Sequence, residues 1–192
     1  EHVLIVEGED DKIALEKLLP SMSTKIKRAI QNGTFIIDYI GGAGNLPYKL
    51  SFYRNLQCKY HVLLDNDDAG RHAGSEAERQ GLLDVRNVTY AICNGSPNAE
   101  IEDCYNKAVY ENAILNEFGV NINVAEFRGN KKWSDRIAGC FLSQGKLWND
   151  AMEKRVKLVV ANEISEEVDT VLNEHKRSSM DALVTSLETL LS

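Results

Sequence analysis

The chain has 192 residues, of which 43% are hydrophobic, and its formal net charge at pH 7 is −7. This length can bury one substantial core with a small appended subdomain, and the acidic balance excludes a protein that attracts nucleic acid through its overall field. No apolar run reaches transmembrane length and no signal peptide is visible, so we expect a cytoplasmic protein without a membrane partner.

The first predicted strand, residues 2–6, runs into a cluster of acidic residues. The strand sequence is His-Val-Leu-Ile-Val, and Glu7-Gly8-Glu9-Asp10-Asp11 follows it directly. Apolar residues at helical spacing then predict a helix. Gly8 permits a tight exit from the strand, which leaves Glu7 at the strand end and Asp11 in the first helical turn.

The second predicted strand, residues 34–40, leads into a glycine loop. The loop sequence is Gly41-Gly42-Ala43-Gly44-Asn45, and a helix is predicted from there to about Leu56. The loop lacks the Lys-Ser/Thr pair of a P-loop, so it predicts no nucleotide site. It is either a tight turn or a DNA contact in which the backbone around Gly42 and Gly44 donates hydrogen bonds to a phosphate.

The third predicted strand carries two acidic residues at its carboxyl end. His61-Val-Leu-Leu64 suits a buried strand, and Asp65 and Asp67 follow. Side chains alternate along a strand, so these two carboxylates should point the same way and repel each other unless a cation such as Mg²⁺ lies between them. Helix capping is the alternative role for acidic residues at this position. If the first and third strands are neighbours, Glu7 joins the group.

The remaining elements complete an alternating pattern. We expect a helix over residues 70–83, a strand over 87–93 and a helix over 99–118, which together predict a doubly wound, mainly parallel α/β sheet. Beyond Gly119 we expect a short β-rich stretch over 120–127 and then a packed pair of C-terminal helices. The predicted division is a catalytic core over residues 1–127 and a helical addition, packed on the core, over 128–192.

The start of this addition is basic and aromatic. Residues 128–157 contain eight basic and three acidic residues, with Trp133, Phe141 and Trp148 among them. Such a segment is able to follow a phosphate backbone and stack on bases, and we name Lys131, Lys132 and Arg136 as candidate DNA contacts. The alternative is that the aromatic side chains belong to the core and the basic ones to a solvated face.

The acidic motifs together resemble a known family. Glu7-Gly8-x-x-Asp11 after one strand, followed by Asp65-x-Asp67-x-Ala69-Gly70 after a later one, is similar to the Toprim domain of topoisomerases, bacterial primases, recombination mediators and OLD (overcoming lysogenisation defect) nucleases. The stretches 41–45 and 99–103 resemble the OLD nucleases in particular. The resemblance covers about the first 105 residues.

This resemblance implies a DNA endonuclease domain that uses two Mg²⁺ or Mn²⁺ ions. Their predicted ligands are Glu7, Asp11, Asp65, Asp67, Glu102 and Asp103. Glu100 is an alternative to the last two, and the helix dipole alone is another explanation for acids there. The resemblance also implies a late catalytic lysine, for which we choose Lys157 over Lys154, besides catalytic roles for Glu7, Asp65 and Asp67.

The resemblance further implies partners outside this chain. OLD nucleases carry an ABC-type ATPase domain before the Toprim domain, so we expect such a domain in the same protein and a possible homodimer formed through it. The chain begins at Glu1 without a methionine, which agrees with a part of a longer protein.

Two other functions stay open. A receiver domain of two-component signalling is also a parallel α/β fold with acids after its first strand, an acceptor Asp after its third and a late Lys. Its first acids are an adjacent pair at the strand end, however, whereas Gly8 follows Glu7 here. The second alternative is an inactive Toprim domain that only binds DNA or protein, against which the full set of acids argues.

Overall fold

The computed structural model describes all 192 residues, Glu1–Ser192, around one parallel sheet. Its strands are β1 (His2–Val6), β2 (Phe35–Tyr39), β3 (Lys59–Asp65) and β4 (Val88–Ala91), and their order is β2-β1-β3-β4. The central strands β1 and β3 are mostly apolar because helices cover both of their faces. The predicted parallel α/β fold is confirmed, and β1 and β3 are neighbours, as the proposed grouping of Glu7 with Asp65 requires.

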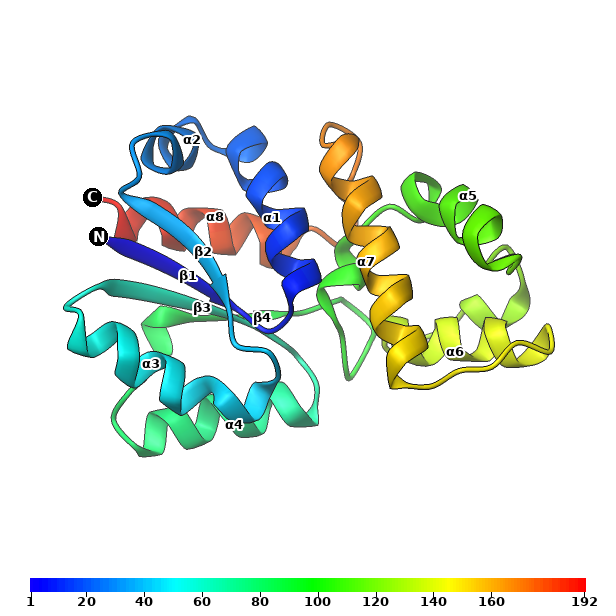
Figure 1. Ribbon diagram of the computed structural model, residues 1–192, viewed down its shortest axis with the longest axis horizontal. Helices are drawn as coiled ribbons and strands as arrows, with labels where there is room; N and C mark the ends of the chain where they lie inside the picture. The colour runs from blue at the N-terminus through cyan, green and yellow to red at the C-terminus, as the bar shows by residue number, and fades with distance from the viewer.

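Five helices form the two outer layers (Figure 1). One face is covered by α1 (Glu9–Met22), α2 (Thr24–Gln31) and α8 (Ser178–Leu190), and the other by α3 (Leu46–Asn55) and α4 (Asp68–Arg79). Side chains of β1 alternate between the two cores, so Leu4 and Val6 pack with α1 and α8 while Val3 and Ile5 pack with α3 and α4.

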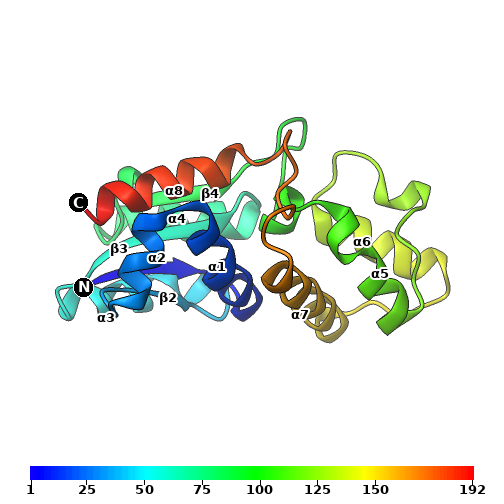
Figure 2. The same ribbon diagram turned by 90° about the horizontal axis from the view of Figure 1, so that it is seen from above.

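Three further helices form a lobe beyond the carboxyl ends of the strands, seen at the right of Figures 1 and 2. They are α5 (Lys107–Phe118), α6 (Trp133–Ser143) and α7 (Asp150–Glu166). The lobe shares its core with the sheet, because Trp133 and Val160 belong to the same buried cluster as Leu4 and Leu15. The α7 helix packs along both α1 and α5.

The predicted division at residue 127 does not follow this grouping. The lobe begins earlier, with α5, and α8 leaves it again to pack on β3 and β4. The predicted boundary separated segments by composition, whereas the spatial arrangement depends on which apolar face each helix buries. No helix has both the length and the apolar character that a membrane crossing requires.

Three predicted elements differ in detail. Residues 120–127 form no strand: Val120 and Ile122 are buried within an irregular segment, and Ala125–Phe127 form a 3₁₀ turn. The helix predicted over 99–118 is divided into a 3₁₀ turn, Ile101–Cys104, and α5, whose first turn is capped by Asn106. The expected C-terminal helical pair is also wrong: α8 packs on the sheet, and residues 167–177, between α7 and α8, form no helix.

His61 is a polar side chain in the centre of the sheet. It is only 2% exposed, and its Nε2 lies 2.8 Å from Thr89 Oγ1 on β4. Burial lowers its pKa from 6.5 to about 4, because the imidazolium would lose its hydration. The folded protein therefore holds His61 neutral at pH values where the unfolded chain would protonate it.

This difference predicts an acid-sensitive contribution to stability. The contribution is complete above pH 6.5 and is lost progressively as the pH falls toward 4, because the unfolded state binds the extra proton. The slope from this one group reaches at most about 1.4 kcal/mol per pH unit. Urea unfolding of the wild type and of His61→Gln between pH 7 and 4.5 should show a shallower fall for the variant. A difference between the two proteins that stays constant with pH would contradict this assignment.

Candidate metal centre

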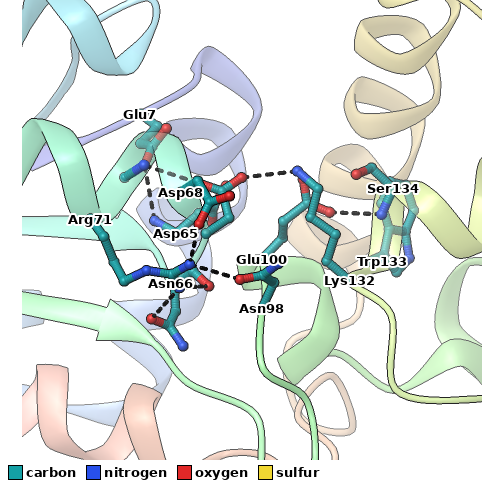
Figure 3. A network of polar contacts seen from close by, with 12 residues as sticks. Glu7, Asp65, Asn66, Asp68, Arg71, Asn98, Glu100, Lys132, Trp133 and Ser134 are labelled. Carbon is teal, nitrogen blue, oxygen red and sulfur yellow. Dashed lines mark hydrogen bonds and ion pairs between the residues drawn. The ribbon is translucent and has the colours of Figure 1, made fainter.

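The site lies at the carboxyl edge of the sheet, where β1 and β3 end side by side. Glu7 Oε1 accepts a hydrogen bond from the backbone N–H of Asp65 at 3.0 Å, which ties the two strand ends together (Figure 3). Burial raises the pKa of Glu7, and the nearby Asp67 raises it further. The neighbouring strands therefore bring Glu7 and Asp65 together as the acidic motifs predicted.

Asp67 serves two purposes at the start of α4. Its Oδ1 accepts from the N–H of Gly70 at 3.0 Å, so the helix-capping alternative holds for this oxygen. Its Oδ2 lies 2.9 Å from Lys132 Nζ. Burial alone would raise the pKa of Asp67, but the Gly70 N–H and the Lys132 ammonium lower it below its usual value. Asp67 therefore stays ionised and presents one oxygen toward the site.

Gly70 is required by the close contact between α4 and the end of β3. A Cβ at this position would overlap the backbone oxygen of Asp65 and lie 3.0 Å from Glu7 Oε1. The backbone cannot yield as a flexible side chain would. A glycine here thus lets the helix start directly against the two strand ends that carry the acids.

A second acidic group lies at the start of α1. Asp11 Oδ2 accepts from the N–H of Gly8 at 2.8 Å. Carboxylate oxygens of Asp10, Asp11 and Glu102 all lie within 4.8 Å of one another. Burial raises the pKa of Asp11 well above its usual value, and the adjacent Asp10 adds to this. These like charges need a positive partner.

The 3₁₀ turn Ile101–Cys104 brings the last acids into place. An antiparallel bridge between Asn66 and Ala99 joins this segment to the end of β3, and Arg71 reinforces it through Asn66 and Asn98 (Figure 3). The N–H of Ile101 donates to Asp65 Oδ1 at 3.1 Å. The turn is therefore fixed directly beside Asp65.

The acid before this turn, Glu100, and the two acids within it, Glu102 and Asp103, have different roles. Asp103 Oδ2 accepts from the N–H groups of Glu100 and Trp133 at 2.9 and 3.1 Å, and its Oδ1 pairs with Arg136. Both Asp103 oxygens are held by backbone N–H groups and a guanidinium. Glu100 Oε2 likewise accepts from the N–H of Ser134 at 2.7 Å, but its Oε1 contacts only the ammonium groups of Lys132 and Lys157. Of these two alternatives for a ligand, the geometry therefore favours Glu100 over Asp103. Arg136, predicted to contact DNA, is instead buried, and it also donates to the backbone oxygens of Lys131 and Phe127.

Lys157 extends from α7 into the middle of the acids. Its Nζ lies 3.4 Å from Glu100 Oε1 and 3.5 Å from Glu102 Oε1. Burial would lower the pKa of this lysine, but the surrounding carboxylates, Glu102 first and then Asp65, raise it well above its usual value. Lys154 is exposed on the same helix. The structure thus brings Lys157, and not Lys154, to the acidic group.

Glu102 provides the clearest sign of a missing positive partner. Its side chain is 3% exposed and its Oε2 is buried without a hydrogen-bond partner. Burial raises the pKa of Glu102 well above its usual value even though Lys157 opposes this. A buried carboxylate oxygen with no donor fits a hard divalent cation, which prefers such ligands.

Two glycines of the loop, Gly41 and Gly42, and one aromatic residue, Trp133, have structural roles. The N–H groups of Gly41 and Gly42 donate to the backbone oxygen of Glu7, and both glycines have positive φ angles, 69° and 119°. The N–H of Gly42 therefore positions the strand end and is not free to bind a phosphate. Gly44 is exposed, so a phosphate contact at Gly44 stays a prediction. Trp133 is fully buried, with its Nε1 donating to Tyr110, so it cannot stack on a base.

Gly70→Ala should damage both the fold and the site. We expect a loss of about 1–3 kcal/mol in the free energy of unfolding, the usual cost of overpacking, because the added methyl pushes α4 away from Asp65. Gly139→Ala on α6 is the matched control, since a Cβ there meets its nearest neighbour at an ordinary 3.5 Å. Equal urea midpoints for the two variants would refute the close packing at Gly70.

Lys157→Met should destabilise the metal-free protein strongly. Removing one partner of a buried ion pair typically costs roughly 3–5 kcal/mol, and several carboxylates here depend on this one ammonium. Lys154→Met should change the free energy of unfolding by less than about 0.5 kcal/mol, as exposed positions do. Urea unfolding in EDTA measures both, and Mn²⁺ should recover part of the Lys157→Met loss. Similar stabilities for the two variants would show that Lys157 is not held among the acids.

Comparison with known proteins agrees with this geometry. Residues 1–67 match the family model for the overcoming lysogenization defect protein-like TOPRIM domain. Neither curated proteins nor solved structures give a significant match. Toprim domains are nucleic-acid-related domains that bind divalent metals through acidic residues, and many are nucleases or primases. Residues 1–67 are therefore similar to the OLD-like TOPRIM domain, and the parallel sheet with flanking helices is a Toprim-like α/β fold.

Proposed function

We propose that this domain is a divalent-metal-dependent endonuclease that hydrolyses DNA phosphodiester bonds with two Mg²⁺ or Mn²⁺ ions. The observation that carries the proposal is the arrangement of two carboxylate groups around one buried lysine, Lys157. The first group contains Glu7, Asp65 and Asp67, and the second contains Asp11 and Glu102, while Glu100 contacts both Lys157 and Lys132.

The residues of the site would have different roles in the hydrolysis. A pair of bound cations supplies an activated water and stabilises the leaving oxygen of a phosphodiester. Asp65 and Asp67 hold their carboxylates at the strand end through the N–H groups of Ile101 and Gly70. Lys157 places a positive charge near Asp65, where it would stabilise the extra negative charge of the transition state.

Lys132 would contribute to substrate binding. Its ammonium contacts Asp67 and Glu100 at 2.9 and 3.3 Å in the protein alone, and its side chain is one quarter exposed. Cations at these carboxylates would compete with Lys132 for them and free it to contact a DNA phosphate. Lys131, the exposed neighbour, would extend this contact.

Two further parts of the proposal concern other chains. We propose that the domain acts within an ATPase-linked OLD-family protein, and that it dimerises through that ATPase part. The support is the OLD-like character of the family match. The receiver alternative is less well supported, because the lysine near Asp65 comes from a lobe helix, α7, and not from the end of a sheet strand.

Cleavage of supercoiled plasmid tests the nuclease directly. We expect nicked or linear product with Mg²⁺ or Mn²⁺ and none with EDTA. Glu7→Gln and Asp65→Asn should each lower the rate at least about 100-fold, because each removes a carboxylate charge that holds the cations. Lys157→Met should have an effect of similar size, because it removes a positive charge that stabilises the transition state. Lys154→Met should cleave like the wild type.

Three other experimental outcomes would each contradict the nuclease proposal in a different way. Cleavage that persists in Glu7→Gln and Asp65→Asn would point to a contaminating nuclease and leave the site without support. Absence of cleavage by a folded wild type that binds Mn²⁺ would favour a binding module. Labelling of Asp65 by acetyl phosphate would favour the receiver function.

A further inference from the structure

Tyr105 is a fully buried tyrosine whose hydroxyl has no hydrogen-bond partner. It follows the 3₁₀ turn that carries Glu102, and its backbone N–H donates to the oxygen of Glu102 at 3.2 Å. A bridge to Leu172 holds the same residue from the other side. Its position is therefore fixed by the backbone, and an unpaired hydroxyl there costs about 1–3 kcal/mol unless a ligand satisfies it.

Tyr105 and the second carboxylate group line one small cavity, which is too narrow for a separate water molecule. The cavity is lined by polar residues from three segments and closed by apolar residues of α1 and α7; its polar lining consists of Asp10, Asp11, Glu102, Tyr105 and Lys157. Two of these side chains, Glu102 and Tyr105, have buried oxygens without a partner. Two such oxygens in one acidic cavity indicate a ligand that satisfies both.

Asp10 belongs to the same cavity, and the sequence did not single it out. Its carboxylate folds back over Gly8, where a Cβ would overlap Asp10 Oδ1 and lie 3.4 Å from Asp11 Oδ2. The absence of a side chain at Gly8 therefore leaves room for both carboxylates. Three acids from α1 and the 3₁₀ turn then face one small space.

We propose that Asp10 and Tyr105 complete the second cation site, with Asp10 as a ligand beside Asp11 and Glu102, and Tyr105 as a positioning residue. The free oxygen of Glu102 binds the cation, and the Tyr105 hydroxyl donates a hydrogen bond to one of the carboxylates that hold it. A cation bound in this way satisfies both unpaired oxygens and neutralises the acids, which an uncharged ligand would not do. This inference rests on the proposed function only in treating the cavity as a cation site.

Terbium luminescence tests the site without any measurement of cleavage. Tb³⁺ replaces hard divalent cations at oxygen ligands and emits when a nearby aromatic side chain transfers excitation to it. We expect sensitised emission from the wild type that Mg²⁺ displaces. Asp10→Asn should weaken Tb³⁺ binding at least about 10-fold, and Tyr105→Phe should weaken it several-fold, at the lower end of the effect of losing an outer-shell partner.

Two controls separate this role from a structural one. Tyr60→Phe removes a hydroxyl that donates to Leu82 at the other end of β3, and it should leave Tb³⁺ affinity unchanged. In EDTA, Tyr105→Phe should be at least as stable as the wild type to urea, because its hydroxyl has no partner there. A Tyr105→Phe variant that is destabilised in EDTA but binds Tb³⁺ normally would show a purely structural residue.

The result also separates this inference from the nuclease proposal. Wild-type affinity in both Asp10→Asn and Tyr105→Phe, or no Tb³⁺ binding by the wild type, would overturn it whether or not plasmid is cleaved. Weakened binding in both variants together with absent plasmid cleavage would keep the cation site and reject the nuclease.

Discussion

The structure depends on the burial of several like charges at one edge of a sheet. Glu100 and Glu102 are almost fully buried, and Asp11 is also buried. Glu7 and Asp65 are half-buried beside them. Carboxylates in such surroundings either take up protons or require positive partners. Burial raises the pKa of Asp11, Asp65 and Glu102, whereas Lys157 and Lys132 together lower the pKa of Glu100. The protein alone thus neutralises only part of the charge that it collects.

The helical lobe supplies that partial neutralisation. Lys157 comes from α7, Lys132 precedes α6, and the N-terminus of α6 donates the N–H groups of Trp133 and Ser134 to Asp103 and Glu100. A helix N-terminus carries a partial positive charge, so it stabilises the acids that it contacts. The lobe is therefore a part of the site as well as a packing partner of the sheet. The hydrophobic core that is continuous between them holds these cationic groups in position next to the acids.

The role of a residue could be predicted from the sequence where it follows from the position of that residue at a strand end. Two apolar strands followed by acids predicted that Glu7 and Asp65 would meet, because parallel neighbours end at the same edge. The role could not be predicted where it depends on a partner far along the chain. Nothing in the sequence distinguishes Asp103, which Arg136 and α6 hold, from Glu102 one residue before it. The basic segment was ambiguous for the same reason, since burial of Trp133 and Arg136 depends on the fold of the lobe.

The position of the site between sheet and lobe limits what a short motif can specify. Residues 1–67, the part matched by the family model, provide Glu7, Asp10, Asp11, Asp65 and Asp67 but neither of the lysines that face them. The acids of the 3₁₀ turn, Tyr105 and both lysines come from the later part of the chain. Without cationic partners, these carboxylates would take up protons or be driven apart by their mutual repulsion. Residues 1–67 and the later part of the chain therefore depend on each other. The smallest unit that can hold this charge arrangement is therefore the sheet together with the α5–α7 lobe.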